Sequence, residues 1–219
     1  MERQLNTIPV KEVMHYLGCQ SGDARLEQQI AQAIQRVLQL ARPKLVYQVV
    51  TVSGYDNELQ IPLHGEDVKR LLQSCHHAIF MAATLGAAVD LETKRLAIKD
   101  MGELLVFDAA CNAAIEVLAD EFQEERRVYY QARKQYLSDR FSCGYGDLSI
   151  QIQKAFCDAL DTKRTIGLYV NDSYLLMPMK SITALIGIAD QPQPKRISGC
   201  ENCDMKETCQ LRRGGQRCG

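Results

Sequence analysis

The feature that most constrains the fold is a long amphipathic segment over residues 101–137, the longest periodic stretch in the chain. Apolar residues recur there at spacings of three or four and define a core face: Phe107, Cys111, Ala114, Ile115, Leu118 and Phe122. Polar residues step by four along another face: Asp108, Asn112, Glu116, Asp120 and Glu124. This pattern predicts one long helix with a buried side and a polar side, packed against other elements.

The segments on either side of this helix alternate between helical and extended patterns. Apolar spacing and turn residues predict helices over residues 9–20, 23–41, 64–75, 88–98 and 149–161. Runs of β-branched and apolar residues predict strands over residues 44–55, 58–63, 78–86, 163–170 and 180–190. Several strand pairs are joined too tightly for parallel crossovers. The sequence therefore favours an α+β fold with a mixed, mainly antiparallel twisted sheet flanked by helices.

Composition narrows the functional classes. With 26 Lys+Arg against 27 Asp+Glu, the balanced charge gives no reason to expect binding to nucleic acid or to a membrane. The N-terminal residues lack the apolar core of a signal peptide, and no apolar run approaches the roughly 20 residues of a membrane-spanning helix. We expect a soluble, cytoplasmic protein. Its nine cysteines are then better explained as buried thiols and metal ligands than as disulfides.

Residues 191–196 (QPQPKR) are a break in composition and predict a linker between a domain of residues 1–190 and a cysteine-rich tail of residues 197–219. The tail has the spacing C-x2-C-x5-C-x8-C, formed by Cys200, Cys203, Cys209 and Cys218. Four thiolates at this spacing suit a zinc ion or a [4Fe–4S] cluster, and a chance grouping of spare thiols is the alternative. Six basic and three acidic residues give residues 195–219 a local charge of +3, which suits nucleic acid or an acidic protein such as flavodoxin.

Residues 140–149 (RFSCGYGDLS) form the most unusual loop in the chain. The loop lacks the glycine spacing and the trailing lysine of a phosphate-binding loop, and no histidine is near Cys143 in sequence to activate it as a nucleophile. A surface turn that caps a helix is one explanation. Arg140 beside a glycine-flanked Tyr145 instead suits a small ligand, because arginine binds a carboxylate bidentately and tyrosine offers a flat ring. An amino-acid-like zwitterion fits these groups best.

The pattern Arg140-x-x-x-Gly144-Tyr145, followed by S-x-x-x-M-P-x-K-S over residues 173–181, resembles the activation domain of cobalamin-dependent methionine synthase. HYLG near the start and ATLGAAVD in the middle add weaker agreement, so the resemblance covers roughly residues 8–190. The chain is similar to the small, stand-alone versions of that domain.

This resemblance implies a repair function. In the family, an electron from a flavodoxin-like or ferredoxin-like donor reduces inactive cob(II)alamin, and S-adenosylmethionine then methylates the reduced cofactor. The resemblance thus implies an accessory component of a methyltransferase, with S-adenosylmethionine as its ligand and a cobalamin-carrying methionine synthase as its partner. Such a protein works by positioning and needs no dedicated general base. Two alternatives are activation of another corrinoid methyltransferase, and a non-catalytic S-adenosylmethionine-binding or metal-binding scaffold.

The resemblance also implies ligand-binding residues in the loop. Arg140 would pair with the carboxylate of S-adenosylmethionine, and Gly144 and Tyr145 would line the pocket. Gly146 and Asp147 follow, where backbone contacts with the ligand are expected.

The long helix would add a carboxylate to this pocket. Asp120 is the best match for it and Glu116 lies one turn away; a solvated acidic stripe is the alternative explanation. Either carboxylate would pair with the ammonium or the sulfonium of the ligand. Cys143 stands where the family often has proline, and the resemblance gives it no role. Lys180, just before the last strand, is expected to be a solvated strand end.

Overall fold

The computed structural model describes residues 1–19 and 22–193. Seven helices lie within these residues: α1 (Val10–Tyr16), α2 (Ala24–Leu40), α3 (Glu66–Leu72), α4 (Ala87–Lys99), α5 (Met101–Gln131), α6 (Ile152–Ala159) and α7 (Thr162–Thr165). Eight strands accompany them: β1 (Lys44–Ser53), β2 (Asp56–Asn57), β3 (Cys75–Thr84), β4 (Tyr136–Leu137), β5 (Phe141–Ser142), β6 (Tyr169–Val170), β7 (Leu176–Met177) and β8 (Ser181–Ala189).

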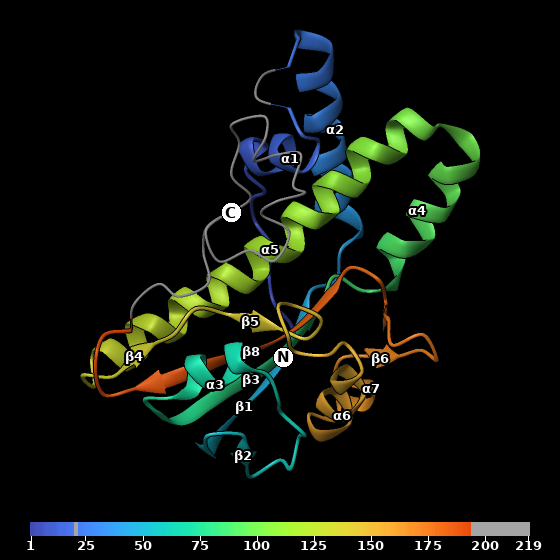
Figure 1. Cartoon of the computed structure of the whole chain (residues 1–219). Coiled ribbons are helices and arrows are strands. Elements are labelled where there is room, and N and C mark those ends of the chain that lie inside the picture. Colours follow the sequence, from blue (N-terminus) through green and yellow to red (C-terminus); the bar gives the residue numbers. More distant parts are fainter. Residues whose placement is uncertain (20–21, 194–219) are drawn as a thin grey trace.

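The main sheet is built on three long strands in the order β1, β3, β8 (Figure 1). Strand β2 pairs with the outer edge of β1, while β4 and β5 both pair with β8. Every pairing is antiparallel, and Met81 at the centre of β3 lies between Tyr47 of β1 and Ala184 of β8. Strands β6 and β7 form a separate two-stranded hairpin. The predicted α+β fold with a mainly antiparallel sheet is therefore confirmed.

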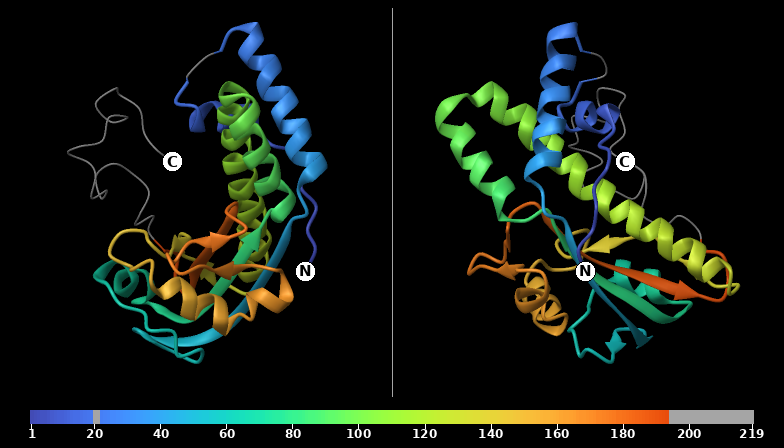
Figure 2. Two further views of the ribbon diagram at one scale, coloured as in Figure 1. Left: turned by 90° about the vertical axis from the view of Figure 1, so that its right-hand side faces the viewer. Right: turned by 180° about the vertical axis from the view of Figure 1, so that it is seen from behind.

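Helices cover both faces of this sheet, as the two views of Figure 2 show. Helices α1, α2, α4 and α5 lie on one side, and α3, α6 and α7 on the other. The central strand β3 serves both sides, because its side chains alternate between the faces. Ile79 and Met81 belong to the first apolar cluster, which lies under α5. Ala78 and Phe80 belong to the second apolar cluster, on the opposite face of the sheet.

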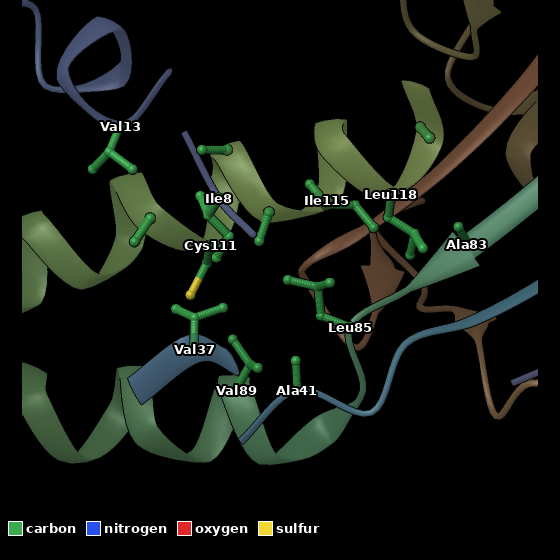
Figure 3. Close-up of a cluster of buried hydrophobic side chains, with 14 of the residues drawn as sticks. Ile8, Val13, Val37, Ala41, Ala83, Leu85, Val89, Cys111, Ile115 and Leu118 are labelled. Atoms are coloured by element: carbon green, nitrogen blue, oxygen red, sulfur yellow. The ribbon is translucent and has the colours of Figure 1, made fainter. Parts of the chain in front are cut away.

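The predicted long helix is present as α5, and it is the main support of the first apolar cluster. Asp100 begins it by accepting a hydrogen bond from the Glu103 amide at 3.0 Å. Cys111 on its inner face is fully buried and points toward Val37 of α2 and Val89 of α4 (Figure 3). The helix ends at Gln131, six residues before the predicted end, because the chain must turn back to pair β4 with β8.

Two predicted strands were wrong. Residues 58–63 do not form a strand; the Asn57 side chain exchanges hydrogen bonds with the Ile61 backbone at 2.9 and 3.1 Å and closes a loop instead. Residues 163–170 contain most of α7 and the two residues of β6. Ile166 and Leu168 gave this segment its strand-like pattern, and both are buried in the second apolar cluster without a long pairing partner.

Five cysteines lie in the described part of the chain, and all are free thiols: Cys19, Cys75, Cys111, Cys143 and Cys157. Three of them are buried, as expected for packing residues. The cysteines of the tail and residues 194–196 of the predicted linker lie outside the described residues. No helix within residues 1–19 and 22–193 is both long and apolar enough to cross a bilayer.

Candidate functional site

Arg140 lies against the polar face of α5, where three side chains hold its guanidinium. Its Nη2 is 2.6 Å from Glu116 Oε2, and its Nη1 is 2.9 Å from Asp120 Oδ1. Nη1 also donates to Gln123 Oε1 at 3.2 Å. The Arg140 side chain is only 13% exposed. The structure therefore brings together Arg140, Asp120 and Glu116, three residues that the sequence analysis selected.

The short strands β4 and β5 place Arg140 on this helix. Tyr136 and Leu137 of β4 pair with one end of β8, and Phe141 of β5 pairs with Leu185 in its middle. Phe141 is buried in the second apolar cluster, on the face opposite α5. Since neighbouring residues of an extended chain point to opposite faces, Arg140 is directed toward α5.

Helix α1 adds Tyr16 to the same site, a residue that the sequence analysis did not select. The pKa of Tyr16 is raised to about 12, first by burial and then by the negative charges of Glu116, Glu12 and Asp120, against a lowering effect of Arg140. The phenol is thus within electrostatic reach of the Arg140 cluster, on a residue that is 43% exposed. The signal for it in the sequence was HYLG, a weak part of the resemblance.

Residues 142–148 form a tight turn within the loop of residues 140–149. The Gly144 amide donates to the Leu148 carbonyl at 2.9 Å, and the Tyr145 amide donates to the Ser142 carbonyl at 3.2 Å. Gly144 has a φ of +82°, a conformation that favours glycine. The Tyr145 side chain is directed outward, with the residue 62% exposed, and its ring meets Phe141 edge-on at 6.3 Å. The turn thus presents one exposed aromatic ring, which contacts Phe141.

Gly146 and Asp147 attach the turn to α3. The Asp147 carboxylate accepts hydrogen bonds from the Glu66 amide at 2.6 Å and from the Asp67 amide at 3.3 Å. Any side chain at Gly146 would collide with the Asp67 carboxylate. The Asp147 side chain therefore caps a helix distant in sequence, which leaves its backbone as the group that could contact a ligand.

Cys143 faces inward from the same turn. Its side chain packs against the second apolar cluster, and burial raises the pKa of the thiol to about 11. The thiolate, which is the nucleophilic form, is scarce at neutral pH in such a group. This environment matches a packing role and gives no support to a catalytic one.

Lys180 makes a second contact with the polar face of α5. Its Nζ lies 2.6 Å from Asp108 Oδ1 and donates to Asn112 Oδ1 at 2.7 Å. The side chain is only 12% exposed, so the expectation of a solvated strand end was wrong. The adjoining Met179 amide donates to Asp90 of α4 at 2.7 Å. Four of the five polar positions that the sequence placed along α5 thus anchor either Arg140 or Lys180.

Within residues 1–19 and 22–193, no three or more His, Cys, Asp or Glu side chains are arranged to hold a metal ion. The four proposed metal ligands of the tail lie outside the described residues.

A cleft of about 270 Å³ is lined by residues 2–6, 41–44 and Leu38, and it shares no residue with the Arg140 cluster. The candidate site is the polar seam formed by Arg140 of the loop with Glu116, Asp120 and Gln123 of α5, with Tyr16 of α1 in electrostatic reach.

No protein-family profile and no curated protein matches this sequence. A solved structure with the same fold is described as the crystal structure of the MetH reactivation domain bound to AdoHcy. It superimposes with a TM-score of 0.63 and 13% identity, over 99% of this chain and 85% of that one. The chain has the fold of the MetH reactivation domain. This likeness extends over both faces of the sheet and agrees with the fold that the resemblance to the methionine synthase activation domain implied.

Proposed function

We propose that this protein binds S-adenosylmethionine and supports the reductive methylation of cob(II)alamin on a separate cobalamin-dependent methionine synthase. The observation that carries the proposal is the fold similarity over 99% of the chain to a reactivation domain described as bound to AdoHcy. AdoHcy is the product that remains when S-adenosylmethionine gives up its methyl group. The Arg140-x-x-x-Gly144-Tyr145 pattern adds support, because its Arg140 lies at the polar seam in this fold.

The proposed ligand site comprises two parts. Arg140 and Asp120, with Glu116 beside them, bind the amino-acid end of S-adenosylmethionine through charge-assisted hydrogen bonds. The turn contributes the exposed ring of Tyr145 and the backbone of Gly144, Gly146 and Asp147, since the Asp147 carboxylate is already used by α3.

The reaction requires this chain only to bind S-adenosylmethionine and to orient its methyl group. One electron from a flavodoxin-like or ferredoxin-like donor and one methyl group from S-adenosylmethionine convert the partner's cob(II)alamin to methylcobalamin. Methyl transfer consumes the reduced cofactor and draws an unfavourable reduction forward. The residues of the seam hold the sulfonium methyl toward the cobalt, and such positioning is the contribution of this chain to the rate.

The cysteine-rich tail is a separate proposal. Cys200, Cys203, Cys209 and Cys218 are proposed to bind a zinc ion or a [4Fe–4S] cluster, on the grounds of their spacing alone. The basic residues of the tail suit docking to an acidic electron donor.

The function is tested by spectroscopy with a cobalamin-loaded methionine synthase that lacks its own activation domain. We expect absorbance to change from cob(II)alamin to methylcobalamin only with this protein, S-adenosylmethionine and a low-potential reductant all present. Arg140→Ala should abolish the conversion. Binding of S-adenosylmethionine without conversion would favour the scaffold alternative. Conversion only on a different corrinoid protein would identify another methyltransferase as the partner.

A further inference from the structure

The cleft of about 270 Å³ lies where the N-terminal segment runs beside the connection from α2 to β1. Backbone hydrogen bonds hold these two segments side by side (Figure 2). The Arg3 amide donates to the Pro43 carbonyl at 2.9 Å. The Leu45 amide donates to the Met1 carbonyl, also at 2.9 Å. Both walls of the cleft are therefore fixed to the edge of the main sheet.

The charges around this cleft do not cancel. Three of the residues that line it are cationic: Arg3, Arg42 and Lys44. Glu2 is the one acidic residue among the described residues of the lining, and Glu125 binds Arg3 Nη1 at 2.7 Å from outside it. Three positive charges against these two carboxylates leave an excess of one. A concave surface with an excess of positive charge concentrates anions.

Arg42 keeps one edge of its guanidinium available for a ligand. Its Nη1 donates to the Gln39 carbonyl at 2.9 Å and to the Ala41 carbonyl at 2.7 Å, which fixes the side chain at the end of α2. Its Nε and Nη2 donate to no group in the described part of the chain. This edge carries two parallel N–H groups, the geometry that binds a carboxylate or a phosphate bidentately.

Lys44 and Arg3 have unused donors as well. Lys44 Nζ forms no ion pair or hydrogen bond with any described residue. Arg3 binds Glu125 through Nη1 alone, and its Nε is buried without an acceptor among residues 1–19 and 22–193. Buried donors are usually satisfied, so each exception needs an explanation. An anion in the cleft would offset the positive charge that these donors carry.

The rest of the lining is apolar or carries a side-chain amide. Leu5 and Leu38 pack against the first apolar cluster, and Ala41 is buried within it. Small-molecule sites commonly combine an apolar wall with a few polar groups that fix orientation. This wall suits a short hydrocarbon part of a ligand, while the cations suit its charged end.

We propose that this cleft is a further binding site, which binds a small organic anion. The Nε–Nη2 edge of Arg42 and the ammonium of Lys44 bind its carboxylate or phosphate group, and Arg3 adds positive charge from the N-terminal segment. The apolar wall contacts the hydrocarbon part. The cleft shares no residue with the Arg140 cluster, so this site is independent of S-adenosylmethionine binding and goes beyond the proposed function.

Nuclear magnetic resonance titration of the isotope-labelled full chain at constant ionic strength tests the inference. The probes are butyrate and butyl phosphate, with acetate and inorganic phosphate as their short counterparts. We expect amide signals within residues 2–6 and 41–44 to shift along one saturating curve, and the tighter butyl probe identifies the anionic group. Its short counterpart should bind at least about threefold more weakly. Shifts that do not saturate, or equal affinity of the short and butyl anions, would overturn the inference.

Charge variants separate recognition from folding. Lys44→Gln removes a cation without a described partner, so the fold should persist, and Arg42→Gln removes the bidentate edge. Each should weaken the tighter probe by about fivefold or more. Arg25→Gln and Lys163→Gln remove one exposed positive charge each outside the cleft and should change little. Equal losses in Lys44→Gln and in these controls would overturn the inference, because the anion would then respond to net charge alone.

Discussion

At the scale of single residues, Tyr16 reports the charge of the seam without any ligand. Its pKa of about 12 lies above the usual 10.0 because of burial and three nearby carboxylates. We expect the ultraviolet phenolate titration, taken as wild type minus Tyr16→Phe, to show a midpoint near 12. Glu116→Gln should lower this midpoint, whereas Glu121→Gln should not. A wild-type midpoint near 10 would contradict the negative seam.

The same shift predicts the sign of a stability effect. A phenol whose pKa is higher in the folded protein than in the unfolded chain keeps its proton more tightly when folded. Its contribution to stability is complete below about pH 10 and is lost as the pH rises toward 12. The free energy of unfolding of Tyr16→Phe should therefore fall less steeply with pH over this window than that of the wild type.

The sequence identified some residues of this site and missed others for a physical reason. Spacing along one helix was enough to place Glu116 and Asp120 on a common face. Which cations contact that face depends on the path of the chain after α5. Strands β4 and β5 bring Arg140 back to the helix, and the turn before β8 brings Lys180 back to it. These contacts join residues that are far apart in sequence, and no local pattern predicts them. The burial of Lys180 and the position of Tyr16 near the polar face of α5 could therefore not be predicted.

At the scale of elements, Lys180 links the turn before β8 to the middle of α5. Lys180→Met should lower the free energy of unfolding by about 1–3 kcal/mol, because Asp108 and Asn112 lose a largely buried hydrogen-bonding partner. Lys163→Met, at an exposed position of α7, provides the matched control and should have little effect. Denaturant unfolding measures both changes. Equal stability of the two variants would contradict the linking role.

The docking of the loop on α3 is a second contact between elements. Asp147→Ala should destabilise the protein by about 0.5–2 kcal/mol, since the Glu66 and Asp67 amides lose their acceptor. Hydrogen exchange of these two amides should increase, and Asp147→Asn should preserve most of the stability. Asp172→Ala, another exposed aspartate in a turn, serves as the control. Unchanged exchange in Asp147→Ala would exclude the cap.

The elements that were predicted correctly are those with long periodic patterns, such as α2, α5, β3 and β8. The five two-residue strands of the described residues, β2, β4, β5, β6 and β7, carry no such pattern, because a strand of that length exists only through its partner. The two wrong strands had apolar residues that pack without a ladder. Whether a segment joins a sheet depends on pairing with a distant strand, and the spacing of apolar residues within the segment does not show whether such a partner exists.

At the scale of the whole molecule, the buried residues of the two apolar clusters in the described part of the chain run from Ile8 to Ala189, and the last strand of the sheet ends at Ala189. A chain truncated after Gln193 should therefore keep its thermal stability and its affinity for S-adenosylmethionine.

The full chain, prepared anaerobically, should contain about one zinc ion or one [4Fe–4S] cluster per molecule, and the truncated chain neither. Elemental analysis and sulfide determination measure this. A metal-free full chain would contradict the tail site.

The central claim is that this fold binds S-adenosylmethionine at the seam organised by Arg140. Titration calorimetry of S-adenosylmethionine into the wild-type chain and into Arg140→Ala tests it most directly, with thermal melting to verify folding. The account predicts a single site in the wild type and an affinity at least about tenfold lower in Arg140→Ala, which should still be folded. No binding to the wild type, or equal affinity in a folded Arg140→Ala, would contradict it.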